Sequence, residues 1–393
     1  MIYHGDESIA KTVRDIGKWL VPLVSLGLAE ILAGITLRFN VDLLVVYPVL
    51  LIITPGLMDL RGDVYGAMGY RLTKALHLGL AQPKYWSREN LVNLATGYVV
   101  SIIATSILAL IGLVLSLITK LNSPDPLSLL FLASISTLIV FVFLTPLTFS
   151  SIIYLYKTGR DPSTFVAAIV TGIGDFTTPL VLLSVAYFHE VFPWYFKLVF
   201  LFFTYSMLIP ITLFVHRNGG LKDLLENLSS SIIASTGSSI GGFILATRVA
   251  LIESNPEILG VLPAFNAVIG AAMGYLGSKL NIDLHIGVEE PTSSFRGDAI
   301  SGFIATYTSI ATAGIIVTLI SPIALVKTAL FVLTITLSVL IVYTLASTTT
   351  YILTVFSYRE GWDPDNIVFP IMTTFVDLLG PIVVSTLGLV LLV

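Results

Sequence analysis

Long apolar stretches recur along almost the whole chain, separated by short polar segments. An α-helix needs about 20 predominantly apolar residues to cross a bilayer, and the stretches reach or exceed that length. The pattern therefore predicts an all-α polytopic membrane protein with eleven spans, over residues 18–38, 43–70, 91–119, 127–156, 163–188, 194–215, 229–251, 257–277, 299–320, 322–356 and 366–391.

The composition supports this class. The chain is 55% hydrophobic and 11% charged, against about 25% charged residues in a soluble domain. Without cysteine it can form neither disulfides nor thiolate metal sites. It has no basic stretch that indicates nucleic-acid binding, and we expect no removable signal peptide in residues 1–18.

Two segments of the chain occur twice. Residues 48–79 match residues 256–287 at an offset of 208, with ten identical positions among 32. Residues 156–181 match residues 358–383 at an offset of 202. Internal duplication in an apolar chain is typical of transporters whose site lies between two related halves.

The duplication predicts four parts: a cytoplasmic tail (1–17), a five-helix repeat (18–188), a linker with one transmembrane helix (189–228) and a second five-helix repeat (229–393). Two directly joined five-helix repeats would be inverted relative to one another. The linker helix adds one crossing, so we expect repeats in parallel orientation. We interpret that helix as a lipid-facing tether.

Positive charges predict the orientation in the membrane. With a cytoplasmic N-terminus, fourteen Lys and Arg residues fall inside and five outside, as the positive-inside rule requires. We therefore expect a multi-pass protein of the cell membrane with its C-terminus outside. Since both repeats lie in one chain, we expect a monomer.

An aspartate recurs inside an apolar run of both repeats, as Asp175 and Asp377. Each follows an Asp-Pro pair, Asp161-Pro162 or Asp363-Pro364, which is typical of a helix start. Fourteen residues of helix place each carboxylate about 20 Å from that start. Two carboxylates at one axis repel each other, and a divalent cation relieves the repulsion. The alternatives are protonation or hydrogen bonds from nearby Thr hydroxyls.

The second predicted helix carries Asp59, Arg61 and Asp63 shortly after Pro55. Proline loosens a helix backbone, whose carbonyls can then bind ions or water. Asp63 is a candidate third cation-binding group or the ion-pair partner of Arg61, and Asp59 is a weaker candidate. The matched segment 267–271 retains the glycine and no charge, so we expect a quasi-symmetric pathway.

Three further kinds of polar residue are weaker candidates for a functional role. Asn266 is a weak cation-binding candidate in the second repeat. Glu30 aligns with Ser238 and so is not duplicated. His77 and His285 are matched, and packing or a helix-end hydrogen bond is favoured over metal ligation.

The second predicted helix resembles a signature of the MgtE family of magnesium transporters: Pro48, Pro55 and Gly62-Asp63, followed by Arg71-Leu72 and Leu76-His77-x-Gly79. Asp161-Pro162 leading to Gly174-Asp175 resembles the family's fifth helix. The duplicated form is similar to the eukaryotic solute carriers related to MgtE.

This resemblance implies that Asp175 and Asp377 bind hydrated Mg2+ at the pore axis, helped by the backbone carbonyls of Thr171 and Thr373. Mg2+ loses its water reluctantly, so carboxylates suit a hydrated ion. The cytosolic sensor domains of bacterial MgtE are not expected here, and neither is gating by them.

We therefore expect divalent cation transport between the repeats, with Mg2+ favoured over Mn2+ or Co2+. The expected partners are these ions and the lipid bilayer, and we expect neither a cofactor nor an enzymatic activity. One alternative is exchange coupled to Na+ or H+, served by Glu30 or Asp59. A remote alternative is an intramembrane aspartyl protease, whose Gly-x-Gly-Asp motif matches residues 172–175. The companion Tyr-Asp and Pro-Ala-Leu motifs of that family are missing from the sequence.

Overall fold

The computed structural model describes residues 3–79, 81–159, 162, 171–287, 291–320 and 324–392. Every regular element within them is a helix, and nine helices are long and apolar enough to cross a membrane. The prediction of an all-α polytopic membrane protein is confirmed.

Within the described part of the chain, the number of candidate spans differs from the eleven expected. Two expected spans, 43–70 and 163–188, are not among the nine candidate spans of the described residues. The first corresponds to α3 (Val49–His77), which contains Asp59, Arg61 and Asp63. The second corresponds to α7, which is described from Thr171 to Phe188. Eleven spans therefore remain a prediction.

The chain forms two compact units, which we call the central unit (Asn40–Val249) and the terminal unit (Met1–Phe39 with Ala250–Val393). Besides α3 and α7, the central unit contains α2 (Val41–Val46), α4 (Arg88–Thr119), α5 (Pro126–Lys157), the short helix η2 (His189–Val191), α8 (Trp194–Ser206), α9 (Leu208–Arg217) and α10 (Leu221–Thr247). The terminal unit contains α1 (Tyr3–Phe39), α12 (Glu257–Ile286), α13 (Pro291–Ile320), α14 (Leu325–Arg359) and α15 (Pro364–Leu391), and α11 (Val249–Ser254) begins at the boundary.

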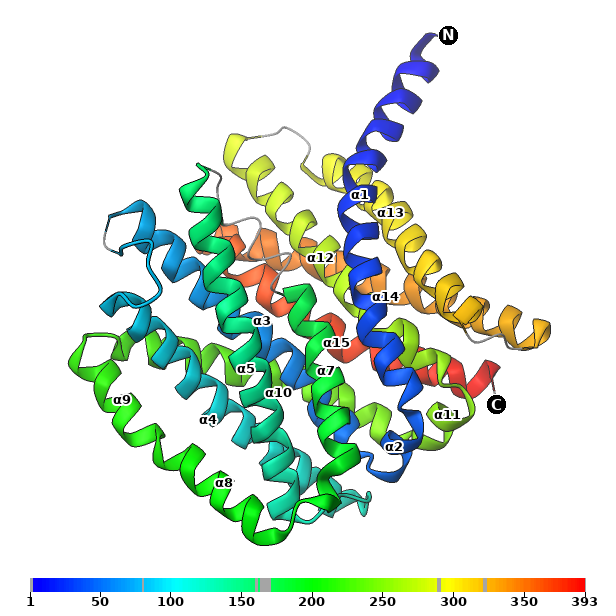
Figure 1. Cartoon of the computed structure of the whole chain (residues 1–393). Coiled ribbons are helices and arrows are strands. Elements are labelled where there is room, and N and C mark those ends of the chain that lie inside the picture. Colours follow the sequence, from blue (N-terminus) through cyan, green and yellow to red (C-terminus); the bar gives the residue numbers. More distant parts are fainter. Residues whose placement is uncertain are drawn as a thin grey trace. The chain divides into compact units, whose positions relative to one another are not determined.

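The first helices of the two sequence repeats are exchanged between these units. In the terminal unit α1 packs on α12 and α13, beside which it lies in Figure 1. In the central unit α10 packs on α3 and α4. Each unit thus combines later helices of one repeat with the first helix of the other.

Glycines allow each exchanged helix to touch its partner's backbone. A Cβ on Gly242 of α10 would lie 2.2 Å from the Leu51 carbonyl oxygen, and a Cβ on Gly34 of α1 would lie 2.0 Å from that of Gly260. Gly34 and Gly242 are equivalent at the offset of 208. Only a residue without a side chain permits such close helix packing.

The linker differs in two ways from its sequence-based interpretation. The helix expected over 229–251 begins at Leu221, so α10 extends into the predicted linker. The crossing itself consists of α8 and α9, and Phe202, Phe203 and Ile209 are exposed as expected of a lipid-facing tether. However, Val215 of α9 is buried in a cluster with α4 and α10, so the tether also packs on its own unit.

Candidate cation-binding site

Asp59 and Asp63 lie one helical turn apart on α3, on the side that faces α10. The Ser238 hydroxyl of α10 donates a hydrogen bond to Asp59 Oδ2, and Asp63 lies next to Ser231. Both carboxylates are partly buried. The spacing of four residues puts them on one helix face, so their helix offers two carboxylates to the serines of α10.

Arg61 points in another direction. Its side chain is 1% exposed, and its Nη2 donates to Thr137 Oγ1 of α5 at 2.8 Å. Thr137 is in turn hydrogen-bonded to Thr105 of α4 at 2.8 Å. The interpretation of Asp63 as the ion-pair partner of Arg61 is therefore wrong within the described residues, because positions two apart do not face each other on a helix.

Asp175 is partly buried on α7, at the level where that helix meets α3. A Cβ on the preceding residue, Gly174, would lie 3.3 Å from the Cβ of Arg61. The nearby Thr178 hydroxyl donates to the Gly174 carbonyl of its own helix at 2.7 Å. The helix position immediately before Asp175 therefore lies against the charged segment of α3.

Asp377 is partly buried on α15, which packs on α12 in the terminal unit. Thr373 lies one turn earlier, and its Cγ2 would be 3.4 Å from a Cβ on Gly270. One turn later, a Cβ on Gly380 would lie 2.1 Å from Asn266 Oδ1. That amide oxygen is buried and has no hydrogen-bond partner in the described part of the chain. The packing of α12 on α15 thus brings Asp377, Thr373 and Asn266 to one interface.

Two expectations about the fifth helices are only partly described. Asp363 immediately precedes α15, whose first residue is Pro364, so the predicted helix start is confirmed there. Its counterpart Asp161 lies outside the described residues, and so does the side chain of Thr171.

The family profile described as MgtE, divalent cation transporter, matches residues 54–185 and 262–387, more than half of the chain. The chain belongs to the MgtE family. It is 25% identical to solute carrier family 41 member 2 of Mus musculus over 427 residues, covering 96% of this chain and 72% of that protein. The corresponding human protein is 26% identical over 403 residues, covering 92% of this chain and 68% of that protein. No solved structure matches significantly.

Membership of the MgtE family identifies divalent cation transport across a membrane as the activity. The two matched regions contain Asp175 and Asp377. The sequence resemblance to MgtE is therefore confirmed, and the roles of individual residues are taken up below as proposals.

The two repeats of this MgtE chain place a carboxylate differently at one equivalent contact. In the central unit, Asp59 of α3 accepts from Ser238 of α10. In the terminal unit, the equivalent positions are Ala267 of α12 and Glu30 of α1. Glu30 is 2% exposed. The acid thus lies on the second helix in one unit and on the exchanged first helix in the other, a relation that the sequence alignment alone did not reveal.

His77 and His285 make equivalent structural contacts in both MgtE repeats. His77 Nδ1 lies 2.9 Å from the Thr73 carbonyl oxygen, and its ring packs edge-on against Tyr156. His285 has the same relation to its own helix and to Tyr358. Among the described residues no group of three or more metal-ligating acids and histidines exists. These contacts confirm the packing and helix-end roles predicted for both histidines.

A buried ion pair in the terminal unit was not predicted. Arg38, at the end of α1, lies 3.5 Å from Glu257, at the start of α12, and both side chains are buried. Arg38 also contacts the Val317 carbonyl of α13. Both charged residues flank apolar runs on the same expected side of the membrane. This placement is the sequence feature from which the ion pair could have been predicted.

Proposed function

We propose that this MgtE-family transporter carries Mg2+ along a pathway between its two repeats, with Asp175 and Asp377 binding the hydrated ion. One observation carries the proposal: the two aspartates occupy equivalent positions on the fifth helices of the two repeats. Each of these helices packs on the second helix of its own repeat. A second helix that contains glycine permits this approach at Gly270.

The available ligands suit a hard cation. Mg2+ prefers oxygen ligands and keeps several of its waters, so a few carboxylate and carbonyl groups are enough to hold it. Pro179 and Pro381 follow the two aspartates by four residues, and neither has an N–H for the helical hydrogen bond to the aspartate carbonyl. Asn266 would add an amide oxygen beside Asp377. Asp63 and the carbonyls of Thr171 and Thr373 complete the proposed set of oxygen groups, and Asp59, the weaker candidate, is assigned to the second candidate function below.

The test is Mg2+ flux into proteoliposomes that contain the purified chain. Asp175→Asn and Asp377→Asn keep the shape of the side chain and remove its charge. Each should lower the flux about tenfold or more, which corresponds to about 1.4 kcal/mol of lost ion stabilisation. Asp125→Asn is the matched control, because Asp125 caps α5 by accepting from the Ser128 N–H at 3.0 Å. Asparagine caps a helix equally well.

The pattern of residual flux separates one shared pathway from two. If both aspartates act on the same ion, either variant alone removes most of the transport. A loss of only half in each variant would instead indicate an independent pathway in each repeat, and undiminished flux would reject these positions. Competition by Mn2+ and Co2+ in the parent chain measures selectivity.

Coupled exchange is the second candidate function, and the exchanged carboxylates favour it. Asp59 and Glu30 lie at equivalent helix contacts of the two units, apart from the proposed Mg2+ positions on the fifth helices. A carboxylate within the membrane is expensive to retain and usually marks an ion or proton pathway. We therefore propose these two groups as the binding positions of a coupling Na+ or H+.

This candidate has its own experiment. An imposed Na+ or pH gradient should drive Mg2+ flux in the parent chain with the membrane potential clamped to zero. Asp59→Asn and Glu30→Gln should lose this gradient-driven flux while retaining flux driven by a membrane potential. If neither gradient drives flux in the parent chain, exchange is rejected and channel-like transport stands.

A further inference from the structure

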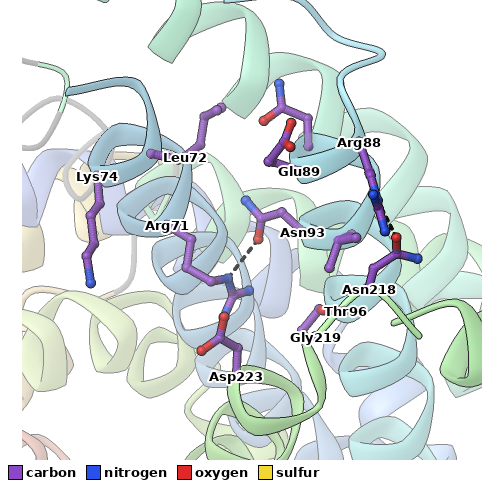
Figure 2. Close-up of a pocket in the computed structure, with 14 residues that line it drawn as sticks. Arg71, Leu72, Lys74, Arg88, Glu89, Asn93, Thr96, Asn218, Gly219 and Asp223 are labelled. Carbon is purple, nitrogen blue, oxygen red and sulfur yellow. Dashed lines mark hydrogen bonds between the residues drawn. The ribbon is translucent and has the colours of Figure 1, made fainter. Parts of the chain in front are cut away.

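A pocket of about 570 Å3 opens in the central unit where the end of α3 meets the starts of α4 and α10 (Figure 2). Its volume lies within the range of about 300–1,000 Å3 that small-molecule sites occupy. The polar groups that matter here are Arg71, Arg88, Glu89, Asn93, Asn218 and Asp223. None of them belongs to the proposed cation-binding set.

Arg71 is held at its Nε and keeps donors for a ligand. Its Nε donates to Asn93 Oδ1 at 2.8 Å, and Asn93 is itself anchored to the Met68 carbonyl of α3 at 2.8 Å. Its Nη2 is buried and has no hydrogen-bond partner among the described residues. Asp223 faces it from α10 and interacts with it electrostatically (Figure 2). A buried charged donor without an acceptor is costly, so the arrangement indicates a missing acceptor.

Arg88 repeats the same arrangement from α4. Its Nε donates to Asn218 Oδ1 at 2.5 Å, and Asn218 Nδ2 donates to the Phe214 carbonyl at 2.7 Å. A guanidinium has five N–H donors, so the bond at Nε leaves both terminal amino groups available. Two anchored arginines therefore line one pocket, while the side chain of Lys74 extends away from them (Figure 2).

The start of α10 adds further donors. Gly219 has a positive φ of 79° and leads into Gly220, which provides no side-chain hydrogen bond to cap the helix. Uncapped N–H groups at a helix start favour an anion. Glu89 and Asp223 are exposed, where they can accept hydrogen bonds from ligand hydroxyls.

We propose that this pocket binds a phosphate-bearing anion, either a soluble phosphate ester or the headgroup of a phospholipid. Paired guanidinium groups match phosphate oxygens in geometry and charge. The same arginines disfavour a divalent cation at this position. On the predicted orientation the pocket opens on the cytoplasmic side, where both sources of phosphate are present. The proposal does not depend on which ion is transported.

The experiment compares ligand-dependent thermal unfolding of the full chain in the presence of EDTA. ADP, added to protein in detergent, tests the soluble source. Nanodiscs of phosphatidylcholine with or without phosphatidylglycerol test the lipid source. One probe should raise the unfolding temperature of the parent chain, and Arg88→Gln should weaken its binding about tenfold through loss of one charge-assisted interaction.

Lys222→Gln is the matched control, because Lys222 is exposed, pairs only loosely with Glu226 at 3.7 Å and does not line the pocket. It removes the same charge nearby and should leave binding unchanged. Arg71→Gln should weaken binding as Arg88→Gln does. Since Arg88 is exposed, its variant remains informative if loss of Arg71 impairs folding. The proposal is overturned if neither probe stabilises the parent chain, or if Lys222→Gln and Arg88→Gln weaken binding equally.

Discussion

At the scale of single residues, Arg61 and its two acidic neighbours on α3 point in different directions and have different partners. Asp59 and Asp63 face the serines of α10, whereas Arg61 is buried towards α4 and α5, where Thr137 accepts its hydrogen bond. A buried guanidinium depends strongly on such a partner, because removing the partner leaves an uncompensated charge.

We therefore predict that Thr137→Val destabilises the chain by about 1–3 kcal/mol, the usual penalty of an unsatisfied buried group. Adding Arg61→Met should recover most of this loss, because the buried guanidinium that lost its acceptor is then removed. Thermal unfolding in detergent measures the stability of the parent chain, of each single variant and of the double variant. Thr308→Val is the control, since its exposed hydroxyl bonds only to the Ile304 carbonyl of its own helix. Equal effects in the two single Thr variants would contradict this account.

At the scale of helices, each exchanged first helix packs against the backbone of the second helix in its unit at a glycine. Gly34 meets the backbone of α12, and Gly242 meets the backbone of α3. In lipid, burial of apolar surface adds little to helix association, so such close packing supplies much of it. The buried Arg38–Glu257 pair adds a polar connection between α1 and α12.

We predict that Gly34→Ala lowers the free energy of unfolding by about 1–3 kcal/mol, as overpacking of a close contact does. The added Cβ would lie 2.0 Å from a backbone oxygen, which cannot move aside as a side chain can. Gly314→Ala in α13 is the matched control, because its Cβ would have no neighbour within 4 Å. Unfolding in detergent should show a lower stability for Gly34→Ala than for Gly314→Ala. Equal stability would show that α1 and α12 move apart to accommodate the added methyl group without cost.

At the scale of the whole molecule, the exchange makes the two halves of the chain dependent on each other. The terminal unit needs α1 from the first repeat, and the central unit contains α10 from the second. The boundaries of the sequence repeats therefore differ from those of the compact units.

A chain severed between Phe192 and Pro193 tests this dependence. We predict that the two fragments co-purify when they are expressed together, and that either fragment alone aggregates or is degraded. Each fragment alone leaves both units incomplete. The first fragment exposes the packing faces of α1, α3 and α4, and the second exposes those of α10, α12 and α13. Size-exclusion chromatography in detergent gives the readout. A stable, monodisperse single fragment would show that the repeats fold independently.

Orientation is also a property of the whole molecule, and the chain suits a labelling test because it contains no cysteine. We propose a cytoplasmic N-terminus and an external C-terminus in the cell membrane. Ser123→Cys, between α4 and α5, should then react with an impermeant maleimide on intact cells. Gln82→Cys, between α3 and α4, should react only after the cells are opened. The reverse pattern would invert the proposed topology.

Much of the architecture was predictable because membrane helices obey a local rule. Span length and apolar composition placed α4, α5, α14, α15 and the α8–α9 crossing within a few residues, and Asp363-Pro364 marked the start of α15. Periodicity also explains why Asp59 and Asp63 share a face. The same rule failed for α10, which begins before the apolar run because its first turns, with Lys222, Asp223 and Glu226, are polar.

By itself, the sequence established an all-helical membrane protein with a duplicated aspartate, since hydrophobic length and internal alignment are properties of the linear chain. Only the tertiary structure decided which first helix packs on which second helix, where Arg61 points, and that Arg71 and Arg88 line one pocket. The physical reason is that apolar composition does not distinguish one lipid-compatible helix face from another. Partner choice depends on complementary shape between residues that lie far apart in the chain, such as Gly34 and Gly260.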